Sequence, residues 1–264
     1  MRPKAGFTLV EMAVALVVVT LLLGGLLVPF VTQVEQRRVN ETISRLEEIK
    51  EALIGYALAN ERFPCPASAT SNGVESFAAG GNATNGACSN FFNGFVPAVT
   101  LGISSVDANG YAIDAWGLTQ NRIHYAVADT TINTIGPPPA PLSFPFTRTG
   151  GMKLVGMGNM SVANLLHVCT TGTGVTATDC SGPATRLTRN ALVVLYSVGK
   201  NAATGGTGTD EAANPNPASS NNDRVYVSRA YAEGGSAGGE FDDIVTWLSS
   251  NILFNRMIVA GKLP

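Results

Sequence analysis

The sequence predicts an α+β protein in which one long N-terminal helix packs on an antiparallel sheet with long, disulfide-pinned loops. An apolar segment at residues 7–31 runs directly into an amphipathic segment at residues 32–60. Segments with the apolar pattern of strands follow only after residue 110. Four cysteines lie beyond the amphipathic segment, in stretches without an obvious regular pattern. The order of helix first and sheet afterwards is typical of this fold class.

The first element is a short basic leader followed by an apolar run of membrane-spanning length. Residues 1–6 contain Arg2 and Lys4, and Glu11 is the only charged residue of residues 7–31. At about 1.5 Å per residue, a helix over this run is roughly 37 Å long and exceeds a hydrocarbon core of about 30 Å. The run is longer than the apolar core of a secretory signal peptide and ends without a small-x-small cleavage site. We therefore expect residues 7–31 to cross a membrane.

Glu11 is costly in such a segment. A carboxylate inside hydrocarbon costs on the order of 2.5 to 3.5 kcal/mol at the helix centre, and less near an end, unless a cation pairs with it. A plain single-pass anchor explains the length of the run but not the positions of Glu11 and Gly6. Because Arg37 and Arg38 balance the two basic residues of the leader, the positive-inside rule leaves the orientation open.

Residues 6–11, with the sequence Gly-Phe-Thr-Leu-Val-Glu, resemble the cleavage and methylation signal of type IV prepilins and type II secretion pseudopilins. The resemblance implies that a membrane-bound prepilin peptidase cuts after Gly6, which makes residues 1–6 a leader peptide. It implies that the same enzyme methylates the new amino terminus at Phe7. It also implies that Glu11 pairs with the Phe7 amine of a neighbouring subunit, so that the buried carboxylate gains its partner on assembly.

The resemblance also implies a location and a set of partners. The precursor would cross the bacterial inner membrane once with its head in the periplasm, and it would end in a periplasmic or extracellular filament. Its partners would be other pilin-like subunits in a homo- or hetero-oligomeric filament, the prepilin peptidase and the inner-membrane assembly platform. The net charge of −2 provides no basic field, and we expect no nucleic acid partner.

Residues 32–60 are expected to continue the helix, because they contain no proline. Apolar residues recur there at spacings of three and four, at Val39, Ile43, Leu46, Ile49, Leu53 and Tyr56. The heptad signal is too short and irregular for a coiled coil, so this stripe should pack on the protein's own sheet. The helix should end before Pro64, and residues 61–264 should form a globular head. Pilins share this plan of a long N-terminal helix half buried in a globular head, which is as far as the resemblance in plan extends.

Strands are expected in the head at residues 111–118, 122–128, 152–156, 191–198 and 224–230. The segment at residues 191–198 is continuously apolar at its centre, which indicates a strand buried on both faces. Asp114-Ala115-Trp116-Gly117 resembles the Asp-x-Trp-Gly hairpin of major pseudopilins. That resemblance implies that Trp116 fills the core.

The four cysteines are expected to form two disulfides outside the cytoplasm. Proximity in the sequence favours Cys65 with Cys88 and Cys169 with Cys180, although four cysteines allow three pairings. A bridge that closes a loop of roughly 15 residues contributes about 3 kcal/mol in the chain-entropy model. The alternative of a zinc site lacks the closely spaced cysteine or histidine pairs of zinc ligand sets.

Residues 238–247, together with residues 197–199, resemble the end of major pseudopilins, although a long insertion separates the two segments here. The resemblance implies a calcium ion in the acidic loop, and calcium takes six to eight oxygen ligands. The candidate calcium ligands are Asp210, Glu211, Asp223, Glu240, Asp242 and Asp243. As an alternative, Asp242 and Asp243 cap a C-terminal helix.

We expect no enzymatic activity, because His124 and His167 are the only histidines and neither lies in a catalytic motif. The predicted function is that of a structural pilin-like subunit, processed by a prepilin peptidase and assembled into a type IV pilus or a type II secretion pseudopilus. The alternative is a membrane-anchored adhesin or binding module that does not polymerise. Such an anchor would keep its leader.

Overall fold

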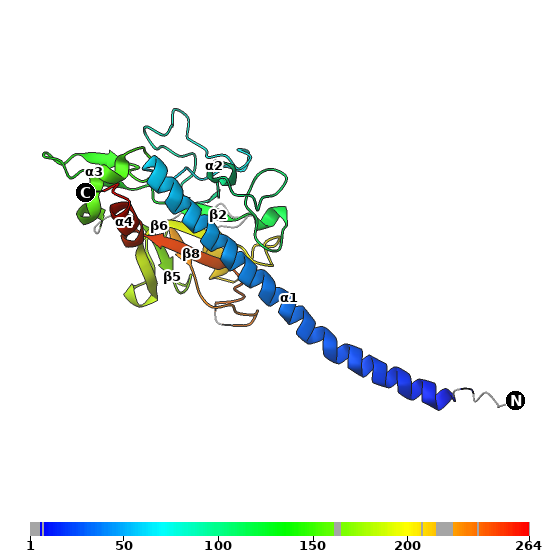
Figure 1. The fold of residues 1–264 in the computed structure, drawn as a ribbon. Helices are drawn as coiled ribbons and strands as arrows, with labels where there is room; N and C mark the ends of the chain where they lie inside the picture. Colours follow the sequence, from blue (N-terminus) through cyan, green and yellow to red (C-terminus); the bar gives the residue numbers. More distant parts are fainter. Residues whose placement is uncertain are drawn as a thin grey trace. The chain divides into compact units, whose positions relative to one another are not determined.

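The computed structural model describes residues 6, 8–160, 165–206, 208–214, 224–236 and 238–263, apart from the side chains of residues 23–31, 157 and 160. The chain forms two compact units, Met1–Glu41 and Thr42–Pro264. Helix α1, Leu9–Asn60, contributes to both units (Figure 1). The long N-terminal helix and its end before Pro64 are therefore confirmed. Phe7 lies outside the described residues.

The described part of the first unit consists chiefly of residues 9–41 of α1. The apolar side chains at the start of this helix are exposed, among them Leu9, Val10 and Leu21. Where the structure describes the chain, we find no helix with a stretch both long and apolar enough to span a membrane. Further along the same helix, Glu35 and Arg38 form an ion pair of 3.6 Å across one turn.

The second unit is built on a six-stranded sheet in which the strands follow the order β1-β2-β6-β5-β7, and β8 also pairs with β6. These strands are β1 Gly94–Phe95, β2 His124–Val127, β5 Leu166–Cys169, β6 Arg186–Ser197, β7 Val225–Val227 and β8 Ile244–Ser249. The other elements are a two-stranded sheet of β3 Thr131–Asn133 and β4 Pro141–Ser143, and the helices α2 Ala98–Leu101, α3 Gly151–Met160 and α4 Ser250–Val259.

The sheet is mixed, and the prediction of a wholly antiparallel sheet is wrong for one pair of strands. Strands β5 and β7 run parallel, with His167 opposite Val225 and Cys169 opposite Val227. A parallel pair needs a crossover connection of about a dozen residues or more, and the chain between β5 and β7 contains β6 and the insertion that follows it. Because β6 pairs with one edge of β5, β7 joins the other edge.

Three of the predicted strands are confirmed. Strand β2 lies within residues 122–128, and β7 lies within residues 224–230. Strand β6 includes most of residues 191–198, and its side chains there are buried on both faces, as a continuous apolar run predicts.

The predicted strand at residues 111–118 forms only isolated bridges, such as the one between Ile113 and Arg122. In this segment the Trp116 nitrogen donates a hydrogen bond of 2.9 Å to Asp114 Oδ1. A side chain that accepts a bond from a nearby backbone amide competes with the pairing of that amide to another strand. Asp114 is the buried residue of this turn, and its Oδ2 accepts a hydrogen bond of 2.5 Å from Ser197 Oγ. Trp116 is only half-buried, so the implied role of this tryptophan in the core is wrong.

The predicted strand at residues 152–156 is also wrong, since these residues belong to α3. Met152 and Val155 are both fully buried. Their spacing of three places them on the same face of a helix but on opposite faces of a strand, and only one side of this segment meets the core.

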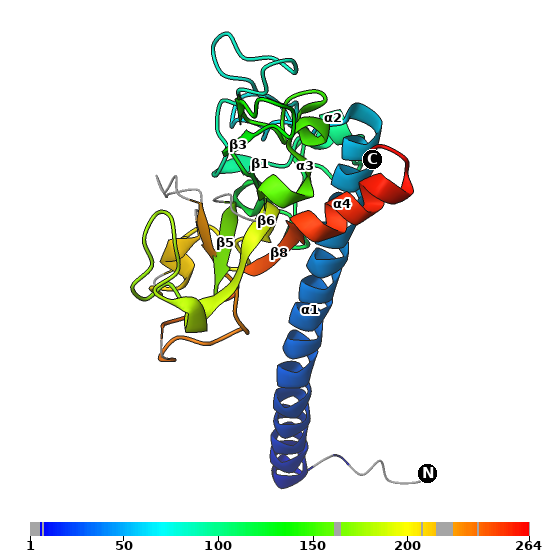
Figure 2. The same ribbon diagram turned by 90° about the vertical axis from the view of Figure 1, so that its left-hand side faces the viewer.

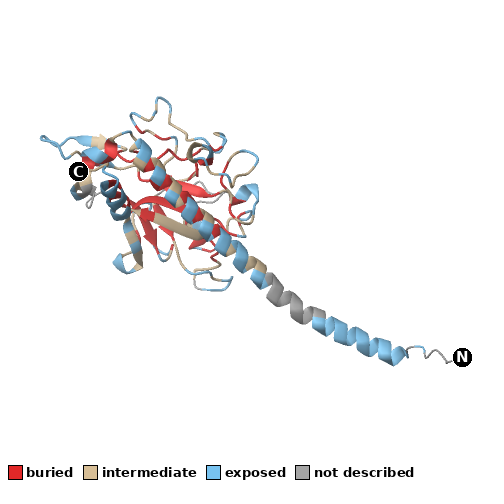
Figure 3. Ribbon diagram, in the orientation of Figure 1, coloured by how far each residue is buried: buried red, intermediate tan, exposed pale blue. Residues whose placement is uncertain are grey.

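The main core lies between α1 and the sheet (Figure 3). Within the second unit, the buried residues of α1 include Leu46, Ile49, Leu53 and Ala57, at helical spacing. Of the predicted apolar stripe, Ile43 is exposed, so the buried part begins at Leu46. Strand β8 leads into α4, which lies beside α1 (Figure 2) and forms an ion pair of 3.5 Å between its Arg256 and Glu51 of α1.

Substitution of one buried and one exposed residue of α1 tests this packing. Leu53→Ala is expected to lower the free energy of unfolding by about 2 to 5 kcal/mol, because Leu53 is fully buried in the core. Gly55→Ala is expected to raise it by about 0.5 to 1 kcal/mol, because alanine favours the helix and an added Cβ at Gly55 meets open space. Denaturant unfolding measures both changes. Equal stability of the two variants would contradict the packing of α1 on the sheet.

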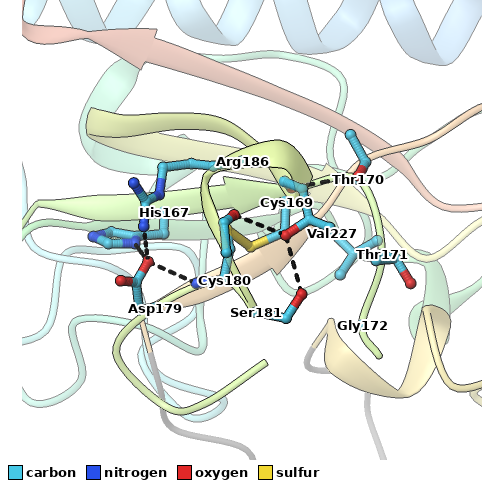
Figure 4. Close-up of a disulfide and its surroundings, with 12 residues drawn as sticks. His167, Cys169, Thr170, Thr171, Gly172, Asp179, Cys180, Ser181, Arg186 and Val227 are labelled. Carbon is cyan, nitrogen blue, oxygen red and sulfur yellow. Dashed lines mark hydrogen bonds and ion pairs between the residues drawn. A yellow bond between two sulfur atoms is a disulfide. The ribbon is translucent and has the colours of Figure 1, made fainter. Parts of the chain in front are cut away.

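Both predicted disulfides are confirmed. Cys65 pairs with Cys88, and Cys169 pairs with Cys180, at Cα–Cα distances of 5.3 and 5.8 Å. The second bridge connects the end of β5 to the loop that precedes β6 (Figure 4).

Candidate functional site

The first candidate site is the start of α1, where Thr8 and Glu11 form a capping box. Glu11 Oε2 accepts hydrogen bonds from the Thr8 nitrogen at 2.8 Å and from Thr8 Oγ1 at 2.9 Å, and the Glu11 nitrogen lies 3.3 Å from Thr8 Oγ1. Such a reciprocal arrangement satisfies backbone donors that the first turn of a helix leaves free. The Thr-x-x-Glu pattern is the sequence signal for this role of Glu11, which the sequence interpretation missed.

The capping box leaves the charge of Glu11 without an ion pair among the described residues, because both donors are neutral. Gly6 is exposed just before the helix, and Phe7 lies outside the described residues. The pairing of Glu11 with the Phe7 amine of a neighbouring subunit stays a prediction.

The second candidate site is an acidic cluster in the head. Of the six predicted calcium ligands, the structure brings together Glu211, Asp242 and Asp243, each with one carboxylate oxygen within 4.8 Å of the others. Glu211 begins a short 3-10 turn, Glu211–Ala213, in the insertion after β6, and the two aspartates lie directly before β8. All three residues are buried, with exposed fractions of 3, 7 and 9%.

The alternative role of the two aspartates as helix caps is wrong. Residues 244–249 form β8, and helix α4 begins only afterwards, with Ser249 at its N-cap position. A segment that pairs with β6 cannot also form the first turns of a helix, so Asp242 and Asp243 lie far from the positive end of α4 in the sequence.

One oxygen of each carboxylate in the cluster is held by the protein. Glu211 Oε1 accepts hydrogen bonds from Asn201 Nδ2 at 3.0 Å and from the Asp242 nitrogen at 2.9 Å. Asp242 Oδ2 accepts from two successive backbone amides, the second of which is that of Asn201 at 3.2 Å. Asp243 Oδ2 accepts from Asn214 Nδ2 at 2.8 Å. These bonds orient the three carboxyl groups.

The remaining oxygens are where a cation would bind. Glu211 Oε2 and Asp242 Oδ1 are buried and have no hydrogen-bond partner within the described ranges. Glycine backbone lies close to both, since a Cβ at Gly206 would lie 1.8 Å from Glu211 Oε2 and one at Gly199 would lie 2.6 Å from Asp242 Oδ1. A buried carboxylate oxygen without a partner is costly, so this arrangement favours a proton or a cation there.

The pKa values of the cluster also indicate that a proton or a cation is favoured at these carboxylates. Burial, together with the neighbouring Glu211 carboxylate, raises the pKa of Asp242 to about 7. Burial raises the pKa of Asp243 well above its usual value. A divalent cation stabilises the charged forms that burial disfavours, and carboxylate oxygens are the ligands that calcium prefers. The residues of this cluster therefore fit a calcium ion.

The other predicted calcium ligands are not part of this cluster. Asp210 Oδ2 forms an ion pair of 3.0 Å with Arg229 Nε, and Glu240 lies 3.6 Å from Lys200 Nζ. Asp223 lies outside the described residues.

The two histidines occupy different surroundings. His124 is buried against the ring of Tyr196, and burial lowers its pKa to about 3, which keeps it neutral. His167 Nδ1 lies 3.1 Å from Asp179 Oδ1, and Asp179 also pairs with Arg186 (Figure 4). Cys180 is next to this group, but its sulfur is bonded to Cys169 and provides no thiolate ligand for a metal.

Comparison with known proteins bears on the first site. No curated protein and no solved structure matches the chain. One family model does match, and it is the prokaryotic N-terminal methylation motif, at residues 1–27. This segment contains Gly6, Phe7 and the Thr8–Glu11 capping box. The N-terminus of this chain thus carries the signal motif of type IV pilins and pseudopilins, as the resemblance predicted.

Proposed function

We propose that the chain is a structural subunit, cut after Gly6 by a prepilin peptidase and assembled through α1 into a type IV pilus or a type II secretion pseudopilus. The observation that carries this proposal is the methylation motif at residues 1–27, which includes the first part of α1, the longest helix of the described chain. The role is mechanical, and the proposal includes no enzymatic activity.

The precursor in this proposal crosses the bacterial inner membrane once through residues 7–31, with the head in the periplasm. Helices that leave lipid for the core of a filament remain in apolar surroundings, so the transfer changes their free energy little. Glu11 differs, because its charge is costly in lipid and gains the Phe7 amine of a neighbouring subunit in the filament. The change in free energy on assembly is therefore favourable at Glu11 and close to zero along the rest of residues 7–31.

The head in this proposal holds calcium at Glu211, Asp242 and Asp243. The cation would supply positive charge among three buried carboxylates and would connect the insertion after β6 to the start of β8. Its role is structural, and the support is the convergence of the three side chains and the unpaired oxygens of Glu211 and Asp242.

Cleavage of the full-length chain tests the proposed processing. When the chain is co-expressed with a prepilin peptidase, we expect the membrane-extracted protein to have lost residues 1–6 and gained one methyl group at Phe7, by intact mass. Gly6→Val should abolish cleavage, because a branched side chain next to the cut bond would hinder the close approach of the peptidase that glycine allows. Gly55→Ala, outside the motif, should be cleaved like the wild type.

A wild-type chain that keeps residues 1–6 would contradict the proposal. It would favour the alternative of a membrane-anchored adhesin or binding module that does not polymerise.

A further inference from the structure

We propose that the loop closed by the Cys169–Cys180 disulfide sets the calcium affinity of the acidic cluster, by holding the turn that carries Glu211. This inference rests on the calcium site of the proposed function. The loop contributes no ligand to the cluster, and it acts through Asp210, the residue before Glu211. Five sets of contacts carry the inference.

The first set joins the disulfide loop to Asp210. In the loop that follows Cys169, the Gly172 nitrogen donates a hydrogen bond of 2.6 Å to Asp210 Oδ1, and Thr171 Oγ1 donates one of 2.8 Å to the same oxygen. Asp210 is almost completely buried, so these two donors replace water around its carboxylate. A displacement of Thr171 and Gly172 would leave a buried charge with fewer partners, which is costly.

The second set is the close packing of Gly172 on the turn. A Cβ at Gly172 would lie 2.5 Å from the Thr209 carbonyl oxygen and 3.0 Å from the Ala213 Cβ. The backbone of the loop therefore lies directly against the residues on both sides of Glu211. Figure 4 shows Thr171 and Gly172 continuing from Cys169, next to the disulfide.

The third set extends from Asp210 to the segment that carries the two aspartates of the cluster. Asp210 Oδ2 pairs with Arg229 Nε at 3.0 Å, and Arg229 Nη2 donates a hydrogen bond of 2.7 Å to the Gly239 carbonyl oxygen. Gly239 lies three residues before Asp242 in the sequence. Asp210 thus connects the disulfide loop on one side with the approach to Asp242 on the other.

The fourth set is a small apolar cluster with the disulfide among its members, separate from the main core. It consists of Cys169, Cys180, Val225, Val227 and Phe241, and Ala213 packs against it. Phe241 directly precedes Asp242, and Ala213 follows Glu211 within the same 3-10 turn.

Asn214 completes the connection between β7 and the acidic cluster. It bonds both backbone groups of Val227, at 2.8 and 2.9 Å, and it also donates to Asp243 Oδ2. Val227 lies opposite Cys169 in the parallel pair of β5 and β7. Glu211 and Asp242 therefore lie next to residues that contact the disulfide cluster or its loop, and Asp243 accepts a hydrogen bond from Asn214, which bonds to Val227.

Loss of the disulfide should weaken calcium binding although the three ligand residues themselves are unchanged. The freed loop samples more conformations, so ordering the Glu211 turn on binding costs more. Residues that orient metal ligands through hydrogen bonds typically contribute about 10- to 100-fold to metal affinity, and we expect a loss of that size.

Calcium titration of the full-length chain in detergent tests the inference. The variant Cys169→Ser/Cys180→Ser is expected to show a calcium Kd about 10- to 100-fold weaker than the wild type by calorimetry. The matched control is Cys65→Ser/Cys88→Ser, which removes the other disulfide. That bridge shares no contact with the described acidic cluster, so its loss should change Kd less than about twofold, within the usual effect of distant sites.

A milder pair of variants covers the case in which the cysteine variant does not fold. Gly172→Ala pushes the loop away from Thr209 and should also weaken calcium binding. Gly182→Ala adds a methyl group in open space two residues after Cys180, outside the loop, and should not. Unchanged Kd in both the cysteine variant and Gly172→Ala would overturn the inference. A wild-type chain that binds no calcium would overturn the calcium site itself, and the inference with it.

Discussion

Calcium at millimolar concentration is expected to raise the Tm of the full-length chain, and a chelator is expected to remove that gain. The physical reason is the cost of three buried carboxylates, of which Glu211 and Asp242 each have an oxygen without a hydrogen-bond partner in the described structure. A ligand that binds only the folded state adds about 2.7 kcal/mol to its stability at roughly 100 times Kd. The shift in Tm is measured by thermal unfolding.

The pH dependence of stability without calcium provides a second measurement on the same site. The pKa of Asp242 is raised from 3.8 to about 7 in the folded chain, by burial and by Glu211. Between these two values the folded state keeps a proton that the unfolded state has released. The contribution of Asp242 to the free energy of unfolding is therefore fully present below about pH 4 and is lost as the pH rises to about 7.

Calcium should reverse this dependence, because the ion competes with the proton for the same carboxylates. Calcium affinity should thus fall as the pH drops below 7. Asp242→Asn should abolish the calcium shift and reduce the loss of Tm with rising pH, to which the buried Asp243 also contributes. Glu240→Gln, outside the described cluster, should keep both effects at the wild-type size. Absence of any calcium shift in the wild type, with no change on addition of chelator, would contradict the site.

Glu11→Gln is expected to prevent assembly into a filament while leaving membrane insertion and cleavage intact. Glutamine can replace glutamate in a capping box, so the hydrogen bonds with Thr8 at the start of α1 should persist. Glutamine has no charge, so the pairing with the Phe7 amine of a neighbouring subunit is lost. Glu11→Val removes both functions, and it should still insert into the membrane but fail to assemble.

The measurement is the fraction of subunits recovered in sheared or pelleted filaments, relative to the fraction cleaved in the membrane. Thr8→Ser is the matched control, because serine keeps the side-chain oxygen of the N-cap and should assemble like the wild type. Incorporation of Glu11→Gln into filaments at the wild-type level would refute the role of the charge. Failure of Thr8→Ser would show that assembly is sensitive to changes at the start of α1 that keep both the charge and the capping oxygen, and it would also contradict the assignment to the charge.

The sequence alone was sufficient for features that depend on nearby residues. The methylation motif lies within residues 1–27, the end of α1 follows from the proline after it, and both disulfides join the cysteines nearest in sequence. The buried strand at residues 191–198 follows from an uninterrupted apolar run. The capping box of Thr8 and Glu11 is equally local, and its pattern was present in the sequence.

Features that depend on distant residues required the tertiary structure. The sequence cannot show which edge of β5 a later strand occupies, so the parallel partner β7 was not predictable. Residues 152–156 have an apolar pattern that is too short to distinguish a helix from a strand. This segment forms the helix α3 because only one of its sides contacts the core, which the sequence does not show.

The acidic cluster shows the same division. The sequence identified six possible calcium ligands, but the insertion between Ser197 and Asp242 made their spacing uninformative. In the tertiary structure Glu211 lies beside Asp242 and Asp243, whereas Asp210 forms an ion pair with Arg229. The sequence determined which residue types were present and where the helix with its N-terminal signal begins. The tertiary structure decided which acids meet, because that depends on long-range contacts that no local pattern encodes.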